Sequence, residues 1–304
     1  MMDPVVPFDQ VASLLPFGIR QLALALPKAE RVVAEEVRLR AGRPVSVTLP
    51  DGEAVLPGSP VVTADDLRTA LEIATQASAH TALERVRHGF VTVRGGHRMG
   101  MCGTAVIKDG AIHNLKQLSS LNIRIARQIP GIGTELLRRL RAEGEPIASV
   151  LVLGPPGAGK TTLLRDLIRG LSSGVGGPPV RVGVADERGE LAAMYHGVPQ
   201  LDLGPHTDVM DSCGKAEGLM MLLRGMNPQV LAMDEITAPA DIEALEMAAG
   251  CGTALLATAH GRGLEDLQRR PLYAQLMERR IFDKVLLVDR QGGARCYRLE
   301  DIPC

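Results

Sequence analysis

The sequence predicts an α/β protein: a mostly parallel sheet in its C-terminal part, preceded by a smaller α+β N-terminal domain. From residue 147 onward, short apolar runs alternate with helical patterns, which is typical of a parallel sheet covered on both faces. Before residue 132, helical patterns are mixed with short hairpin patterns. At 304 residues, the chain is also long enough for two domains with separate cores.

The first elements of the N-terminal domain, expected over residues 1–132, can be assigned in order. Helical spacing across residues 9–26 is interrupted by Pro16. Polar and apolar residues alternate across 36–49 on both sides of an Ala-Gly-Arg-Pro segment, which predicts a hairpin. Thr63 then begins a capping-box signal followed by an amphipathic helix.

Further strands and a linker complete this domain. Residues 89–101 predict a hairpin around a Gly-Gly turn, and residues 121–127 predict a strand. Residues 133–146 are expected to form a connecting segment that includes a helix at 135–142.

The C-terminal domain, expected over residues 147–304, alternates strands with helices. The last predicted strand is the second strand of a hairpin. The predicted strands are 149–153, 181–185, 230–233, 253–258, 284–288 and 295–299.

Composition limits the compartment and the partners. The net charge of -1 gives no excess of positive charge to draw the molecule onto nucleic acid, and aromatic residues make up only 2%. Five cysteines without a CxxC pair favour a reducing cytoplasm over a disulfide framework. The longest uncharged apolar run, residues 247–259, is too short to span a bilayer, so no transmembrane segment is expected.

A glycine-rich stretch after the strand at 149–153 predicts a phosphate-binding loop. It matches GxxxxGK[ST] in full and lies between an apolar run and a helical pattern. Its glycines let backbone N–H groups converge on a polyphosphate, and the helix N-terminus adds partial positive charge. We expect Lys160 to reach the β and γ phosphates, and the Thr161 hydroxyl to hold Mg²⁺. The predicted ATP-binding residues are Gly154, Pro155, Pro156, Gly157, Ala158, Gly159, Lys160, Thr161 and Thr162.

A second strand is expected to carry two acids to the same sheet edge. The apolar run at 229–233 ends in Asp234 and Glu235. We expect Asp234 in the Mg²⁺ shell and Glu235 to orient or deprotonate the attacking water. Acids that end a strand are usually only solvated, but after a phosphate loop they predict an ATPase. About 70 residues separate the two motifs, which leaves room for the extra strand of a RecA-like P-loop (ASCE) ATPase.

Two other strand ends carry candidate polar residues. Asp186 and Glu187 follow the strand at 181–185, and either provide a further acid near the γ-phosphate or are solvated charges at a strand exit. His260 follows the strand at 253–258, where it can sense the γ-phosphate or be a structural histidine.

No obvious cation other than Lys160 is available for the γ-phosphate. Ring ATPases take such a charge from a neighbouring subunit, as an arginine supplied in trans. The candidates are Arg94 and Arg98 on the glycine hairpin, and Arg124 and Arg127 on the strand at 121–127. A strand would place Arg124 and Arg127 on opposite faces, so at most one of the two would serve. For each arginine, a solvated surface role is the alternative.

These motifs together resemble a known family. The combination of GPPGAGKTTLLRD, VADERGE, LRGMNPQVLAMDEI and ATAHG, preceded by RGGHRMGMCG and LNIRIARQI, is similar to the stage III sporulation protein AA family. That family belongs to the RecA-like secretion ATPases, which are relatives of the type II and type IV pilus motors. The likeness covers nearly the whole chain.

The resemblance implies a cytoplasmic ATPase in the mother cell of an endospore-forming bacterium. It would act as a homo-oligomer, expected to be a hexamer, peripheral to the membrane and docked on channel proteins that join mother cell and forespore. Glu187 and His260 match the family's acidic and histidine boxes, and the four arginines match its N-domain set. The pilus motors have Gly-Glu where this chain has Asp234 and Glu235, which favours a metal-binding Asp here.

An ATP-hydrolysing motor or assembly ATPase is the leading hypothesis from these residues. One alternative is a RecA-like nucleic-acid translocase, which the near-neutral charge and the scarcity of aromatic residues disfavour. Another is a nucleotide-gated scaffold with little turnover, which the presence of Glu235 disfavours.

Overall fold

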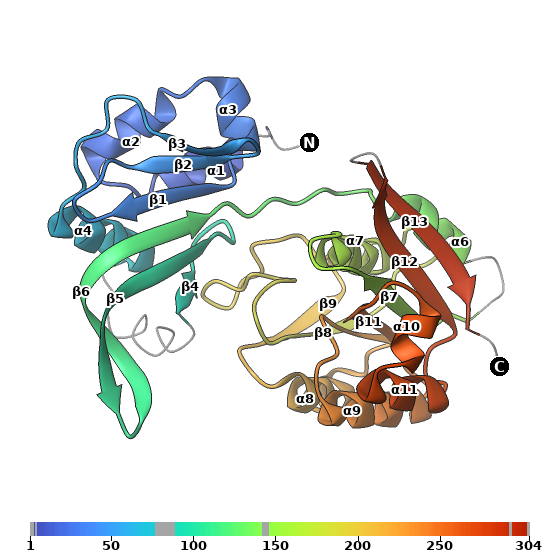
Figure 1. Cartoon of the computed structure of the whole chain (residues 1–304). Coiled ribbons are helices and arrows are strands. Elements are labelled where there is room, and N and C mark those ends of the chain that lie inside the picture. The colour runs from blue at the N-terminus through green and yellow to red at the C-terminus, as the bar shows by residue number, and fades with distance from the viewer. Residues whose placement is uncertain (1–2, 4, 77–88, 142–145, 292–293, 303–304) are drawn as a thin grey trace. The chain divides into compact units, whose positions relative to one another are not determined.

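The computed structural model describes residues 3, 5–76, 89–141, 146–291 and 294–302. It divides the chain into two compact units (Figure 1). The N-terminal unit consists of Met1–Arg127 and Ala193–Gln200, and the C-terminal unit consists of Gln128–Ala192 and Leu201–Cys304. Among the described helices, none has the length and apolar character needed to cross a membrane.

The N-terminal unit contains one six-stranded sheet in the order β3-β2-β1-β6-β5-β4, and every neighbouring pair is antiparallel. Its strands are β1 (Glu36–Arg40), β2 (Ser46–Leu49), β3 (Gly52–Val55), β4 (Phe90–Thr92), β5 (Arg98–Lys108) and β6 (Ala111–Arg124). Its helices include α1 (Val6–Ala12), α2 (Phe17–Leu24), α3 (Lys28–Val33) and α4 (Ala64–Thr75). Pro16 separates α1 from α2, and the predicted capping box forms between Thr63 and Asp66 at the start of α4.

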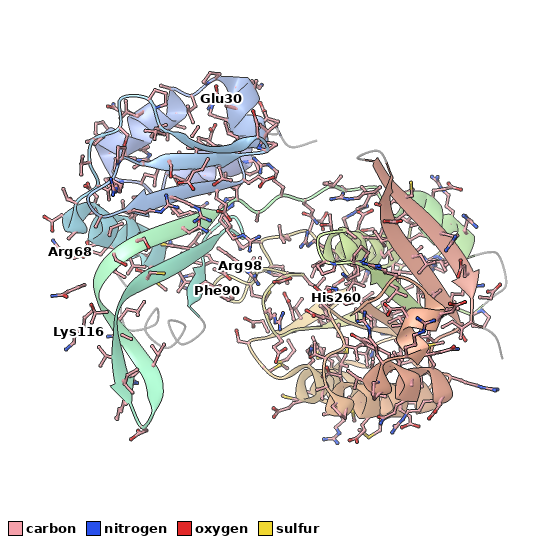
Figure 2. All side chains as sticks on the ribbon, in the orientation of Figure 1. Glu30, Arg68, Phe90, Arg98, Lys116 and His260 are labelled. Atoms are coloured by element: carbon pink, nitrogen blue, oxygen red, sulfur yellow. The ribbon has the colours of Figure 1, made fainter. Side chains whose placement is uncertain are left out.

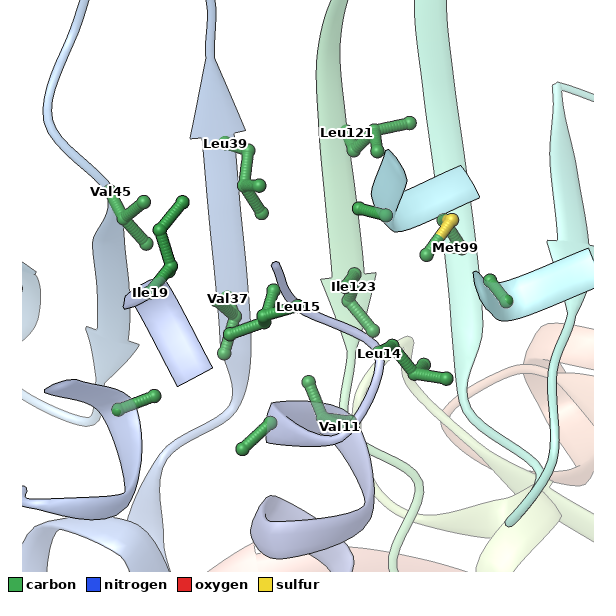
Figure 3. Close-up of a cluster of buried hydrophobic side chains, with 14 of the residues drawn as sticks. Val11, Leu14, Leu15, Ile19, Val37, Leu39, Val45, Met99, Leu121 and Ile123 are labelled. Atoms are coloured by element: carbon green, nitrogen blue, oxygen red, sulfur yellow. The ribbon is translucent and has the colours of Figure 1, made fainter. Parts of the chain in front are cut away.

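The core of this unit lies between the sheet and its helices. Alternate strand residues point to one face, so Val37 on β1 and Ile123 on β6 are fully buried. Figure 3 shows these side chains, together with Met99 of β5, gathered with Val11 of α1 and with Leu15, which lies between α1 and α2. The predicted hairpins therefore form because their apolar face is covered by the N-terminal helices.

The strand predicted at 121–127 is wrong at both ends. Strand β6 begins at Ala111 and stops at Arg124, because the N–H of Ala126 donates to the His97 ring instead of to a neighbouring strand. Between Cys102 and Leu118, β5 and β6 pair only with each other and form a long two-stranded arm (Figure 1). Register shifts in this arm disturb the alternation of polar and apolar residues, which is why the sequence pattern missed it.

The C-terminal unit contains a seven-stranded sheet in the order β13-β12-β7-β11-β10-β8-β9. All neighbouring pairs are parallel except β12 with β13. The strands are β7 (Val150–Gly154), β8 (Val182–Asp186), β9 (Thr207–Asp211), β10 (Val230–Met233), β11 (Ala254–His260), β12 (Lys284–Gln291) and β13 (Ala294–Asp301). The described helices are α6 (Thr134–Leu140), α7 (Lys160–Ser172), α8 (Lys215–Met226), α9 (Pro239–Gly250), α10 (Leu264–Gln268) and α11 (Pro271–Glu278).

The predicted parallel sheet is confirmed, with one additional edge strand. Figure 1 shows α7 on one face of the sheet and α8 and α9 on the other. Because both faces are covered, every residue of β7, β8 and β10 is buried. No strand is predicted from the sequence at β9, which has two aspartates and is only partly buried along its length. The parallel arrangement brings the carboxyl ends of β7, β8, β10 and β11 to one edge.

Candidate active site

The predicted phosphate loop connects β7 to α7. Gly157 and Gly159 have φ values of +74° and +100°, conformations that residues with a side chain rarely adopt. A Cβ built on Gly154 would lie 2.5 Å from the carbonyl oxygen of Val288, so the passage of β12 excludes any larger residue. The loop ends where α7 begins at Lys160, and the first N–H groups of a helix have no intrahelical partner. This geometry suits an anion.

Lys160 is held across the loop and is buried. Its Nζ donates to the carbonyl oxygen of Pro155 at 3.1 Å and lies 3.0 Å from Nδ1 of His260. Burial lowers the pKa of Lys160, and the negative charges of Asp234 and Glu235 act in the opposite direction. A cation therefore lies between the loop and the end of β11.

Thr161 and Asp234, predicted as the metal pair, are in contact. The Thr161 hydroxyl donates to Oδ2 of Asp234 at 2.7 Å, and the hydroxyl of Thr258 on β11 donates to Oδ1 at 2.6 Å. Burial raises the pKa of Asp234, while the two hydroxyl hydrogen bonds oppose the shift. Hydroxyl and carboxylate oxygens are the donors that Mg²⁺ prefers, so this pair fits a magnesium ion.

The carboxylate of Glu235 lies between the side chains of His260 and Arg188. Its Oε1 is 3.1 Å from Nε2 of His260, and its Oε2 is 3.2 Å from Nη1 of Arg188. Its φ of +54° is a left-handed conformation that costs on the order of 1 kcal/mol and is typical of functional positions. His260, labelled at the site in Figure 2, thus contacts both Lys160 and Glu235. The structure brings together five of the predicted residues: Lys160, Thr161, Asp234, Glu235 and His260.

The two acids after β8 separate into different roles. Asp186 is buried, and its carboxylate accepts the N–H groups of Glu190, Leu191 and Ala192. Burial raises the pKa of Asp186, and these N–H bonds oppose that shift. It therefore fixes the loop. Glu187 instead lies 3.7 Å from Nζ of Lys215, at the edge of the site.

Two charged residues of this region were missed by the sequence analysis. Arg188 lies in the same short stretch as Glu187, where the acids are the residues that a motif marks. Lys215 begins α8 and has no motif around it. Its buried Nζ donates to the carbonyl oxygen of Glu235 at 2.6 Å and lies 3.3 Å from Asp241. It therefore ties Glu187 to the segment that follows β10.

The four candidate trans arginines all lie in the N-terminal unit. Arg94 is exposed, and Arg98 lies 4.5 Å from the centre of the Phe90 ring, beside it in Figure 2. The Nε of Arg124 is 3.4 Å from Glu36. Arg127 is partly buried, donates to the carbonyl oxygen of Arg31 at 3.3 Å, and has a pKa lowered by burial. Because β6 ends at Arg124, Arg127 lies outside the strand, and the expectation that the two arginines lie on opposite faces of one strand is wrong.

Comparison with known sequences identifies a family. The family described as "Sporulation stage III, protein AA" matches residues 8–298. Stage III sporulation protein AA of Bacillus subtilis (strain 168) is 39% identical over 291 residues, which cover 94% of this chain and 92% of that protein.

Comparison with solved structures identifies the fold. The pilus retraction motor PilT, solved with bound ADP, has a TM-score of 0.59 at 17% identity. The match covers 89% of this chain and 80% of the PilT chain. The ATPase DotB of Legionella pneumophila has a TM-score of 0.56 at 16% identity. The match covers 88% of this chain and 76% of the DotB chain. These similarities confirm the predicted fold class, which is the RecA-like fold of secretion ATPases.

Proposed function

The chain belongs to the sporulation stage III protein AA family, and on that premise we propose that it is an Mg²⁺-dependent ATPase. The observation that carries the proposal is a set of three contacts at the phosphate loop. Thr161 contacts Asp234, and Lys160 contacts His260, which contacts Glu235. A nucleotide-binding loop thereby faces one oxygen pair suited to a metal and one carboxylate suited to a water molecule.

Hydrolysis would proceed by in-line attack of water on the γ-phosphate. Glu235 would orient this water and accept its proton, with its carboxylate positioned by His260 and Arg188. Lys160 would neutralise charge on the phosphates. A magnesium ion held by Thr161 and Asp234 would supply further charge neutralisation when it is bound.

His260 and Glu187 would connect catalysis to the rest of the unit. His260 would sense the nucleotide, because a phosphate that recruits Lys160 competes with the Lys160–His260 contact. Glu187 would act through Lys215, which binds the backbone carbonyl of Glu235. Both residues would therefore position Glu235.

We infer a homo-oligomeric state, a hexameric ring in which an N-terminal arginine of one subunit completes the site of the next. Support comes from the family, whose name refers to sporulation, and from the fold shared with a pilus retraction motor. In this proposal, the protein works in the cytoplasm at the membrane surface, where partner proteins of a mother cell–forespore channel hold it. ATP hydrolysis would energise that channel.

Substitution of Glu235 by Gln tests the proposal, because it removes the carboxylate and preserves the side-chain shape. We expect kcat for ATP hydrolysis to fall by about 100-fold or more, while ATP binding is retained. Steady-state hydrolysis and equilibrium ATP binding by the full-length protein measure the two effects.

The matched control is Glu243→Gln, which removes an exposed carboxylate from α9. It should leave both the rate and the binding of ATP at wild-type values. A Glu235→Gln protein that hydrolyses ATP at the wild-type rate would contradict the proposed mechanism. A wild-type protein that binds ATP without turnover would instead favour the nucleotide-gated scaffold.

A further inference from the structure

A charged side chain from the last strand lies directly against the phosphate loop. Arg295 belongs to β13, and a Cβ built on Gly159 would lie 2.8 Å from its Nε and 3.1 Å from its Cζ. The guanidinium therefore lies over the Cα of Gly159, the residue before Lys160. From the sequence alone, this part of the chain is predicted only as a hairpin strand.

Arg295 reaches the loop from the side opposite to the catalytic acids. The sheet order places β12 and β13 on one side of β7, and β11 and β10 on the other. His260 and Asp234 come from the β11–β10 side, where they contact Lys160 and Thr161. These contacts mark the end of the site where the γ-phosphate reacts. Arg295 is therefore at the end of the loop that faces away from hydrolysis.

The strand that carries Arg295 is fixed to the loop strand. Strand β12 pairs in parallel with β7, and its Val288 carbonyl oxygen packs against Gly154. Strand β13 pairs with β12 over its whole length, with Arg295 in register with position 290. A side chain on a paired strand is positioned more accurately than one on a loop.

We propose that Arg295 is a nucleotide-binding residue that the chain supplies to its own site, where the guanidinium binds the α-phosphate. The assignment rests on the proposed ATPase function, since it needs a nucleotide in the loop. The planar donors of a guanidinium match phosphate oxygens, and a phosphate loop cradles the α and β phosphates with its backbone. Because ATP and ADP share the α-phosphate, Arg295 sets the affinity for both and not the rate of hydrolysis.

The test compares full-length wild type with Arg295→Ala in equilibrium binding of fluorescent ATP and ADP analogues with Mg²⁺. We expect both affinities to fall about tenfold or more, the loss expected for one charge-assisted hydrogen bond. At saturating ATP, kcat should stay within about twofold of wild type, so the effect appears in KM. Arg295→Lys should recover part of the affinity, because it restores the charge without the planar donors.

Arg298→Ala is the matched control, since Arg298 lies on the same strand and its Nε pairs with Glu300 at 2.6 Å. It should bind ATP and ADP with wild-type affinity, and both variants should unfold at the wild-type temperature. Equal losses in both variants would indicate hairpin damage and overturn the assignment. The assignment also fails if Arg295→Ala binds the nucleotides unchanged or more tightly, or loses ATP affinity alone.

The same loss for GTP as for ATP supports a phosphate contact, and a loss confined to adenine nucleotides overturns it. The two proposals can also fail separately. A wild-type protein that binds neither ATP nor ADP would refute the ATPase proposal, and the role of Arg295 with it. If wild type binds ATP and ADP and Arg295→Ala binds them with the same affinity, only the role of Arg295 is refuted.

Discussion

In the C-terminal unit, charged side chains from several segments converge at one edge of the sheet, whereas in the N-terminal unit the ion pairs of Arg68 and Arg124 join residues of one helix or of adjacent strands. Lys160, Asp234, Glu235 and Lys215 all lie within a chain of contacts at the ends of β7, β10 and β11. In the N-terminal unit, by contrast, Arg124 pairs with Glu36 on the adjacent strand β1.

This difference determines whether the charged residues of each unit, taken alone, indicate a ligand site. A convergent set of charges in a buried position indicates a ligand, because burying a charge without a compensating partner is unfavourable. Charges that are paired locally indicate only a stable surface. In the proposed ring, an N-terminal arginine would gain a catalytic role only through a neighbouring subunit, and experiments on the assembled protein would test which arginine serves.

The largest expected effect concerns Arg94, which is exposed on the turn between β4 and β5. If it completes a neighbour's site, Arg94→Ala should lower kcat by about 1,000-fold and leave the free energy of unfolding unchanged. Arg127→Ala should instead reduce stability, because that guanidinium is partly buried and donates to the carbonyl oxygen of Arg31. Steady-state ATP hydrolysis and denaturant unfolding measure the two effects.

Mixing two inactive proteins shows whether Arg94 acts in trans. Subunits with Arg94→Ala keep an intact phosphate loop, and subunits with Lys160→Ala keep an intact arginine. In mixed rings, some sites receive both functional parts, so activity should return. If the mixture stays inactive, or if Arg94→Ala alone hydrolyses ATP normally, the arginine in trans is a different residue or does not exist.

The next effect, on stability, concerns Lys215, which is buried and lies 3.3 Å from the buried Asp241. Lys215→Met leaves that carboxylate without its cation, which should lower the free energy of unfolding by about 3–5 kcal/mol. The double variant with Asp241→Asn should recover part of the loss, because the amide can still accept hydrogen bonds without a buried charge. Denaturant unfolding of the full-length protein measures both changes.

An exposed ion pair of the N-terminal unit provides the contrast. Arg68 lies 2.7 Å from Asp65, with side-chain exposures of 65% and 77%. Arg68→Ala should change the free energy of unfolding by less than about 1 kcal/mol. If both ion pairs gave equally small changes, the distinction between buried and exposed charges in the two units would not hold.

The sequence predicted the C-terminal unit better than the N-terminal unit for a physical reason. The phosphate loop and the acids after β10 are local motifs, and a buried parallel strand is recognisable as a continuous apolar run. Pairing within the β5–β6 arm involves register shifts that no local pattern shows. The place of residues 193–200 in the N-terminal unit likewise depends on tertiary contacts, such as the bond from the Gly95 N–H to Gln200.

Within the site, the residues that sequence reasoning missed are those that no local motif marks. Lys160, Thr161 and Asp234 belong to motifs in which spacing in the chain determines spacing in the fold. Lys215, Arg188 and Arg295 reach the site from distant segments, and only the sheet order brings them there. Their contribution could be found only after the strands were placed.

The last prediction, on the pH dependence of stability, concerns His97, a fully buried histidine of the N-terminal unit. Its Nδ1 accepts the N–H of Ala126 at 3.0 Å, and its Nε2 lies 3.1 Å from Oε1 of Gln10. Burial, together with the charge of Arg127, lowers the pKa of His97 to about 4. The unfolded chain therefore binds more protons than the native protein between about pH 4 and 6.5, so the stability that this histidine confers is lost as the pH falls through that window.

The loss should reach about 3 kcal/mol at the acid end and should disappear in His97→Gln, which has no titrating ring. Other groups titrate over the same range, so the relevant quantity is the difference between the two unfolding curves as a function of pH. The difference in the free energy of unfolding between wild type and His97→Gln should change below about pH 6.5 and be constant above it. Parallel curves over the whole range would mean that the folded protein protonates His97 as readily as the unfolded chain does. Because the His260 ring contacts Lys160 and Glu235 in the C-terminal unit, its substitution should change catalysis and leave this pH dependence of His97 in place.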